Sequence, residues 1–248
     1  MKTTRREFGK VALGSALGAI SGQALIGSKV QAQTRAAHAS GVYHEGVMQL
    51  NQNESARGPG PKTMEAIHNH TTKRVGMGYS PDHVNELRDG IADYYGVGTE
   101  NVLLATGSTP ILRGTVRAFC NASQAFVTPM PTYSTSLQEA NRLNLPAVEL
   151  SLDKGLGVDL ESLARNAEGA GLLYVCNPNN PSGTVHGPDA IEKFVRRVMR
   201  ENPEVRVHID EAYINYTRPG AMETALPLAM EFENVFITRS FSKAHGLA

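Results

Sequence analysis

Two side chains with reactive groups directly follow apolar segments of the sequence. Lys243 comes directly after Ser242 and three residues after Ser240, just beyond the apolar run 235–237, and Asp210 follows the run 205–209. A lysine amine can attack a carbonyl carbon and hold a ligand covalently. A carboxylate that follows a buried strand needs a cationic or hydrogen-bonding partner. Taken one at a time, a surface lysine and a helix-capping aspartate are the ordinary interpretations, but the pair also suits a binding site.

Three further segments add groups that could hold a ligand. The run 107–109, Gly-Ser-Thr, stands between an expected strand and an expected helix, where backbone N–H groups bind anions. Asn180 lies in a proline-bracketed turn, and Tyr133 follows two prolines. A helix cap, a turn residue and a packing aromatic are the structural alternatives. Together, however, these segments supply what a pyridoxal phosphate site requires: an amine, a carboxylate, a phosphate cradle, an amide donor and an aromatic surface.

Short apolar runs alternate with amphipathic segments along most of the chain. The spacing predicts helices over 62–72, 84–95, 111–119, 134–143, 160–165 and 190–199, and strands over 102–105, 125–127, 147–150, 172–176, 205–209 and 235–237. Such alternation predicts an α/β fold with a mostly parallel sheet covered by helices on both faces. Ligands of these sheets bind beyond the carboxyl ends of the strands, where the residues named above stand.

The first 32 residues have the order of an export signal. Arg5 and Arg6 precede Phe8 and Lys10, a weakly apolar, glycine-rich run follows, and small residues come before Gln33. This order indicates a twin-arginine signal peptide and a periplasmic or secreted protein. A short membrane anchor is the alternative. We further expect an N-terminal arm over 33–75 and a pyridoxal-phosphate-binding large domain over 76–248.

The composition excludes several other classes of protein. The 248 residues contain 24 Lys and Arg against 24 Asp and Glu, so the chain is not a basic nucleic-acid binder. Two cysteines, Cys120 and Cys176, cannot build a disulfide framework. His208, Asp210 and Glu211 could be considered as metal ligands, but no further ligand spacing supports them and we expect no metal site.

Three motifs in order carry a resemblance to a known family. They are Tyr-Val-Cys-Asn-Pro-Asn-Asn-Pro-Ser-Gly-Thr over 174–184, His-Ile-Asp-Glu-Ala-Tyr over 208–213, and Thr-Arg-Ser-Phe-Ser-Lys-Ala-His-Gly-Leu-Ala over 238–248. The chain resembles the class I/II aminotransferases of pyridoxal phosphate fold type I, in the branch of histidinol-phosphate aminotransferase. The likeness extends over 50–248 and includes the short runs 51–54 and 78–81. It implies a three-layer large domain, with the family's small C-terminal domain missing from this sequence.

The resemblance also implies roles for individual residues. Lys243 would hold pyridoxal 5'-phosphate as a Schiff base and move the substrate proton, and Asp210 would pair with the pyridinium nitrogen. Asn180 and Tyr213 would bind the phenolic oxygen of the cofactor, and Tyr133 would stack on its ring. The phosphate of the cofactor would be bound by Gly107, Ser108, Thr109, Ser240 and Ser242. Tyr79 would reach the phosphate of the cofactor in a partner subunit, which implies a homodimer. Asn53 matches a segment near the substrate.

The expected reaction is transfer of an amino group between an amino acid and a 2-oxo acid or phosphorylated ketone. A decarboxylase or lyase that uses the same cofactor is one alternative, and an inactive truncated fragment is another. In the family, an arginine for the phosphate and a domain carrying an arginine for the substrate follow the lysine motif, and neither is in this sequence. We therefore expect the 248-residue chain alone to have little or no transaminase activity.

Overall fold

The structure is a computed structural model that describes residues 52–71 and 81–248. The expected signal peptide, most of the expected N-terminal arm and Tyr79 lie outside the described residues. From Asn53 onwards the chain forms one compact unit.

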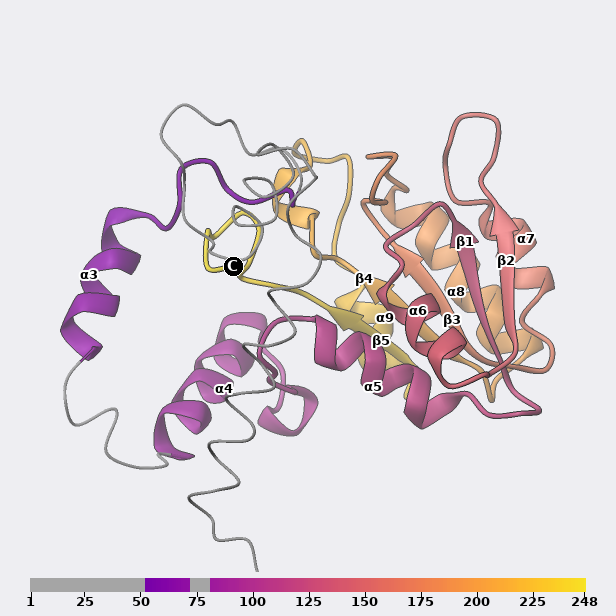
Figure 1. Ribbon diagram of the computed structural model, residues 1–248, viewed down its shortest axis with the longest axis horizontal. Coiled ribbons are helices and arrows are strands. Elements are labelled where there is room, and N and C mark those ends of the chain that lie inside the picture. The colour runs from indigo at the N-terminus through magenta and orange to yellow at the C-terminus, as the bar shows by residue number, and fades with distance from the viewer. Residues whose placement is uncertain (1–51, 72–80) are drawn as a thin grey trace, which may run out of the picture. The chain divides into compact units, whose positions relative to one another are not determined.

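A five-stranded parallel sheet forms the centre of this unit (Figure 1). Its strands are β1 (Ala125–Met130), β2 (Ala147–Ser151), β3 (Ala170–Cys176), β4 (Arg206–Asp210) and β5 (Val235–Thr238). The order in the sheet is β2-β1-β3-β4-β5, and every neighbouring pair is parallel. The α/β fold class with a mostly parallel sheet is therefore confirmed.

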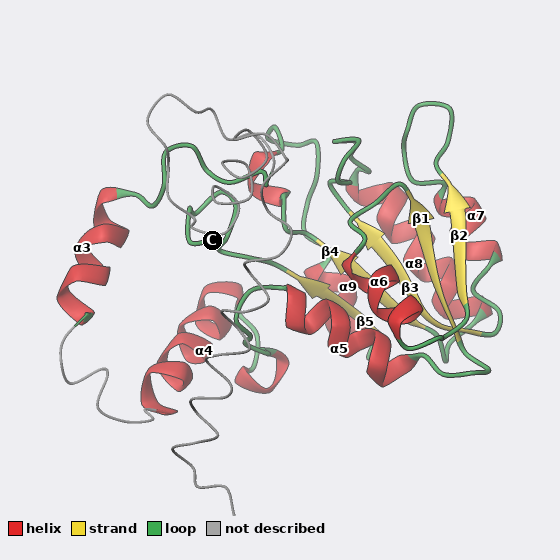
Figure 2. Ribbon diagram, in the orientation of Figure 1, coloured by secondary structure: helices red, strands yellow, loops and turns green. Residues whose placement is uncertain are grey.

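Helices cover both faces of the sheet (Figure 2). The helices on one face are α5 (Thr109–Phe119) and α6 (Thr135–Arg142). On the other face lie α7 (Leu160–Arg165), α8 (Pro188–Glu201) and α9 (Leu226–Glu231). Because successive strand residues point to opposite faces, Leu172 and Tyr174 pack with α5 and α6, whereas Leu173 and Val175 pack with α7 and α8.

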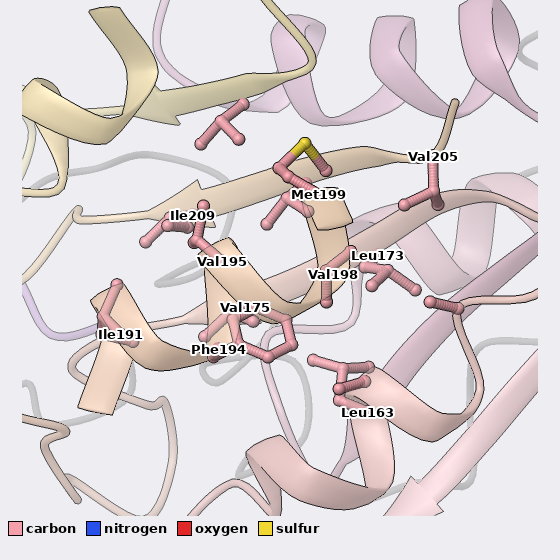
Figure 3. Packing of buried hydrophobic residues seen from close by; sticks show 14 of the residues in the cluster. Leu163, Leu173, Val175, Ile191, Phe194, Val195, Val198, Met199, Val205 and Ile209 are labelled. Atoms are coloured by element: carbon pink, nitrogen blue, oxygen red, sulfur yellow. The ribbon is translucent and has the colours of Figure 1, made fainter. Parts of the chain in front are cut away.

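Helix α8 shows how the sequence pattern produces this packing. Its apolar residues recur three and four positions apart, so they share one face that is buried against β3 and β4 (Figure 3). Pro188 opens the helix, where its missing N–H costs no hydrogen bond. The shorter α7 is capped by Asp159, whose side chain accepts a hydrogen bond from the backbone N of Ser162 at 2.8 Å.

Two helices precede the sheet, α3 (Pro61–His70) and α4 (Pro81–Tyr95). The helix α3 buries none of its side chains. A short 3₁₀ helix, η2 (Thr99–Asn101), follows α4, and a second, η3 (Ile214–Tyr216), follows β4. The predicted strand 102–105 is wrong: Val102 has extended dihedral angles, but the segment pairs with no described strand and Leu103 is 77 % exposed.

The other predicted elements are present, most of them with shifted ends. Helix α7 begins and ends at the predicted residues, and α5 begins two residues earlier than expected, at Thr109. Strand β1 extends through Pro129 to Met130, because hydrogen bonding to β2 continues along it. Helix α9 is not predicted, because Pro227 in its first turn interrupts the apolar pattern.

Candidate active site

The loops that follow β1, β3, β4 and β5 begin at the same edge of the sheet because the strands are parallel. The chain reverses direction across the sheet between β1 and β3, the point where open α/β sheets bind ligands. Here the two loops are joined directly. Thr132 Oγ1 donates to Asn179 Oδ1 at 2.7 Å, and Asn179 Nδ2 donates to the carbonyl oxygen of Pro131 at 3.2 Å.

Asp210, the last residue of β4, is buried at this edge. Its Oδ2 accepts a hydrogen bond from Tyr174 Oη at 2.9 Å. Its Oδ1 accepts from Thr238 Oγ1 and from the backbone N of Ala212, each at 3.1 Å. These donors come from three positions in the fold, so the carboxylate has one fixed orientation.

The electrostatic state of Asp210 reflects its burial. Desolvation raises the pKa of the carboxyl above its ordinary value of 3.8, while the donors Tyr174, Thr238 and Ala212 oppose that rise. All three donors are uncharged, and Glu211 beside it adds a further negative charge. A ligand group carrying a proton and a positive charge would therefore be stabilised at this carboxylate.

Asn53, Asn180 and Tyr213 form a second polar cluster at the same edge. Tyr213 Oη accepts from Asn53 Nδ2 at 3.1 Å and from Asn180 Nδ2 at 3.3 Å. Because both amides donate to the phenolic oxygen, the hydroxyl proton of Tyr213 is left to donate to another acceptor. The three residues line a cavity of about 620 Å³, whose wall also includes Glu54 and Arg218.

Lys243 lies in a turn after β5 and is half-buried. The turn is closed by backbone hydrogen bonds from Gly246 N to Lys243 O and from Leu247 N to Phe241 O, both at 3.1 Å. Within it, Ser240 Oγ accepts from the backbone N of Ser242 at 3.0 Å. The structure therefore places the predicted lysine and both serines in one turn at the carboxyl end of the sheet.

The remaining predicted site residues stand at the starts of two helices. Ser108 is the N-cap of α5 and Thr109 its first residue, preceded by Gly107 with a φ of 72°. The Ser108 side chain makes no cap hydrogen bond to α5. The first backbone N–H groups of α5 have no acceptor within the helix, as at the start of every α-helix. Tyr133 follows β1, is half-buried and packs on the cluster beneath α5 and α6.

Several residues near Asp210 were missed by sequence reasoning. Tyr174 and Thr238 bond the carboxylate, and Thr238 also bonds His208 Nε2 at 3.0 Å. Strand register could have indicated them, since β3 and β5 both pair with β4 beside Asp210. The structure also shows an ion pair of 2.9 Å between the buried Glu211 and Arg239. Arg239 directly precedes the turn that contains Lys243, so this ion pair connects the start of that turn to the end of β4.

Among residues 52–71 and 81–248, no three His, Cys, Asp or Glu side chains are grouped so that they could hold a metal ion. His208 instead bonds Thr238, while Glu211 accepts from Arg239 and from the backbone N of Ala225. No helix in these described ranges has the length and apolarity needed to cross a membrane.

The comparisons with known proteins agree with this arrangement. A family profile described as "Aminotransferase class I and II" matches residues 45–248. The chain therefore belongs to the class I and II aminotransferase family.

Curated relatives show how much of the family's length is present. The chain is 32 % identical over 209 residues to histidinol-phosphate aminotransferase of Limosilactobacillus fermentum, a match that covers 83 % of this chain and 57 % of that protein. It is also 32 % identical over 219 residues to aromatic amino acid aminotransferase of Nocardia farcinica, covering 86 % and 59 %. The chain thus spans somewhat more than half the length of these relatives.

A solved structure confirms the fold. Histidinol-phosphate aminotransferase from Sinorhizobium meliloti, in complex with pyridoxal-5'-phosphate, matches with a TM-score of 0.74 at 24 % identity, covering 91 % of this chain and 58 % of that one. Cystalysin from Treponema denticola matches with a TM-score of 0.68 at 15 % identity, covering 91 % and 59 %. The same fold therefore occurs in two proteins whose solved structures contain pyridoxal 5'-phosphate.

Proposed function

We propose that this chain is the cofactor-binding part of an aminotransferase that uses pyridoxal 5'-phosphate. The observation that carries the proposal is the buried Asp210 carboxylate at the carboxyl end of β4, held by three uncharged donors beside the Tyr213 hydroxyl cluster. Family membership and the names of the relatives support the same function.

The residues present fit this cofactor. Asp210 offers a fixed negative charge in a desolvated position, which suits a protonated pyridine nitrogen. Tyr213, whose oxygen already accepts from two amides, has a proton to donate to the phenolic oxygen of the ring. Ser108 and the first N–H groups of α5 would bind the phosphate, together with Ser240 and Ser242.

Each residue then has a definite task. When bound, pyridoxal phosphate supplies an electron-accepting ring that stabilises negative charge on the substrate carbon. Asp210 keeps the proton on the ring nitrogen, and Asn180 and Tyr213 hold the ring oxygen in place. The Nζ atom of Lys243 would accept the proton removed from the substrate α-carbon and hold it for transfer. Tyr133 covers the ring and excludes water.

For the substrate, we propose an amino acid as donor and a 2-oxo acid or phosphorylated ketone as acceptor. Histidinol-phosphate and aromatic amino acid aminotransferases among the relatives support this class. The cavity beside Asn180 and Tyr213 also contains Arg218, a cation that suits an acidic group on either compound. A decarboxylase or lyase remains the second candidate, because L-threonine-O-3-phosphate decarboxylase from Porphyromonas gingivalis and a C-S lyase from Staphylococcus hominis have the same fold.

We also propose export by the twin-arginine route to the periplasm and a homodimer with shared sites. The paired arginines at the start of the sequence support the first statement. The motif around Tyr79, which resembles a segment that reaches the partner's cofactor in this branch, supports the second. A fusion of residues 1–40 to a reporter that is active only after export of the folded protein tests the route, with Arg5→Lys and Arg6→Lys together as the inactive control.

Cofactor binding is tested by adding pyridoxal phosphate to the purified chain. We expect a visible absorption band that borohydride removes, with the reduced cofactor recovered by mass spectrometry on the peptide containing Lys243. Lys243→Ala should lose the adduct, whereas Lys154→Ala, a change at an exposed lysine, should retain it. Recovery of the adduct elsewhere, or of none, would contradict the proposal.

The reaction class needs a separate assay. An aminotransferase converts the bound cofactor with amino acid alone and regains the original band only when a 2-oxo acid is added. A decarboxylase or lyase turns over with the amino acid alone, releasing carbon dioxide or an elimination product. Continuous product release without a 2-oxo acid would favour the second candidate.

A further inference from the structure

His208 is a fully buried, ionisable side chain to which the proposed function assigns no task. It stands on β4 two residues before Asp210, so both side chains lie on the same face of the sheet. Its ring lies between two aromatic rings, with centroids 5.5 Å from Tyr174 and 4.6 Å from Phe236. Its Nε2 atom is 3.0 Å from Thr238 Oγ1.

The directions of the hydrogen bonds follow from the groups involved. An ionised carboxylate can only accept, so the single hydroxyl proton of Thr238 points to Asp210 Oδ1 at 3.1 Å. The Thr238 oxygen must then accept from His208, which requires the tautomer with its proton on Nε2. Consistent with this neutral tautomer, the Nδ1 atom is buried without a hydrogen-bond partner among the described residues.

We propose that His208 is a positioning residue that acts through Thr238 to keep Asp210 ionised and oriented toward the ring nitrogen of the cofactor. The donation from His208 Nε2 to Thr238 polarises the hydroxyl, which strengthens its hydrogen bond to the carboxylate. This proposal rests on the proposed function, because it concerns the partner of Asp210.

The groups around Asp210 define how its charge responds to pH. Among the described residues, the titratable side chains that face it or interact with it include those of Tyr174, Cys176, His208, Glu211 and Tyr213. Burial lowers the pKa of His208 to about 3 and raises that of Tyr174, so neither changes charge near neutral pH. Cys176 is likewise held as a neutral thiol by burial, which raises its pKa. A change in the ionisation of Asp210 as the pH falls should therefore contribute to the loss of cofactor affinity, and this is the contribution that Thr238 and His208 would alter.

The test is the pH profile of pyridoxal phosphate affinity, measured with the whole chain. Thr238→Val removes the hydroxyl between His208 and Asp210, and His208→Leu removes the ring N–H that donates to Thr238. For Thr238→Val we expect the pH at which affinity declines to rise by about one unit, since one hydrogen bond to a charged group corresponds to about one pKa unit. For His208→Leu we expect a smaller rise in the same direction, because the Thr238 hydroxyl still donates to Asp210. Thr238→Ser keeps the hydroxyl and His208→Gln keeps an N–H donor, so both should restore the wild-type profile.

Two controls separate this role from a structural one. Thr115→Val removes another buried threonine hydroxyl, bonded only to the Leu112 carbonyl, and should leave the pH profile unchanged. Thermal melts identify variants that fail to fold. Profiles of Thr238→Val and His208→Leu that coincide with the wild-type profile in folded protein would overturn the proposal.

A measurement without cofactor tests the hydrogen-bond relay from His208 through Thr238 to Asp210 independently of cofactor binding. Nitrogen-15 NMR of the histidine ring should show a neutral His208 with its proton on Nε2 at pH 6, and Thr238→Val should shift that signal. A proton on Nδ1 would overturn the relay even if the wild type binds pyridoxal phosphate. Wild-type protein with the Nε2–H tautomer but no cofactor binding would instead overturn the proposed function, and with it the role assigned to His208.

Discussion

At the scale of single residues, Asp210 combines a functional gain with a cost in stability. Its carboxylate is desolvated at the end of β4, and the groups that donate to it carry no charge. Burying a carboxylate in this way is unfavourable unless a cation or a strong set of donors compensates. Binding of a protonated ring would supply the missing charge, so the empty and loaded forms should respond differently to the loss of this residue.

We predict that Asp210→Asn weakens pyridoxal phosphate binding at least about tenfold, the effect of losing a hydrogen bond between charged groups. Without cofactor, the same variant should be at least as stable as the wild type at pH 7. The reason is that the folded-state pKa of Asp210 is raised above 3.8, so the wild type loses stability as the pH rises from 3.8 through that higher value. Cofactor titration and urea unfolding measure the two effects.

Asp189→Asn is the matched control, because Asp189 is exposed in the first turn of α8. It should leave cofactor affinity unchanged. A cofactor-free Asp210→Asn chain that is much less stable than the wild type would show that Asp210 is mainly a structural residue.

At the scale of secondary-structure elements, a charged cluster joins α5 to α6. Glu139 of α6 is 2 % exposed and bonds Arg117 of α5 at 2.7 Å and Arg142 at 2.6 Å. Hydrogen bonds from Arg142 and then Arg117 lower the pKa of Glu139 to about 2. The cluster holds together the two helices that cover the Asp210 side of the sheet.

This cluster should make stability depend on pH. The folded-state pKa of Glu139 lies below its ordinary value of 4.5, so its contribution is present above 4.5 and is lost as the pH falls toward 2. We expect Glu139→Gln to destabilise the chain at pH 7 and to do so progressively less between pH 4.5 and pH 3. Denaturant unfolding across this range measures the difference, with the exposed Glu149→Gln as control. A difference that does not change with pH would contradict the assignment.

Two glycines should respond oppositely to the same substitution. A Cβ on Gly171, in the buried strand β3, would collide with the carbonyl group of Phe119, whereas a Cβ on Gly114 in α5 meets no atom within 4 Å. We predict that Gly171→Ala destabilises the chain by about 1–3 kcal/mol, the usual cost of overpacking. Gly114→Ala should stabilise it by about 0.5–1 kcal/mol, because alanine favours a helix interior. Equal effects in thermal unfolding would contradict this reading of β3.

At the scale of the whole molecule, α4 and the segment after η2 leave large apolar side chains in water. Tyr94 is 81 % exposed and Leu103 is 77 % exposed, and Val84 and Leu87 on α4 are about half exposed, at 47 % and 49 %. Exposed apolar groups gathered on neighbouring elements promote association between molecules. The unpaired segment 102–105, predicted as a strand, belongs to this region.

We predict that the purified chain self-associates as its concentration rises. Tyr94→Lys combined with Leu103→Lys should lower the association constant at least about tenfold, because each change removes apolar surface and adds like charge. Sedimentation velocity over a range of concentrations measures this. The pair Tyr216→Lys and Met230→Lys, at exposed apolar positions on other elements, is the control. Association that the first pair leaves unchanged would place the interface elsewhere.

Much of the architecture could be predicted because it depends on local patterns. The alternation of short apolar runs with segments of 3.6-residue apolar period located four of the five flanking helices, including the complete α7, and all five strands. Segment 102–105 has the same apolar composition as a strand, yet it pairs with no described neighbour. Pairing is a property of two segments, so the composition of one segment could not decide it.

The reactive residues at the carboxyl ends of the strands are recognisable from the sequence alone: Asp210 at the end of β4, Asn180 and Tyr213 in the adjoining loops, and Lys243 after β5. What those residues contact depends on the tertiary structure. Asn53 reaches Tyr213 across 160 positions, and Tyr174, Thr238 and His208 surround Asp210 because β3 and β5 pair with β4 in one particular register. Register is set by the packing of whole sheet faces, in which a shift of one residue would turn every side chain to the opposite face.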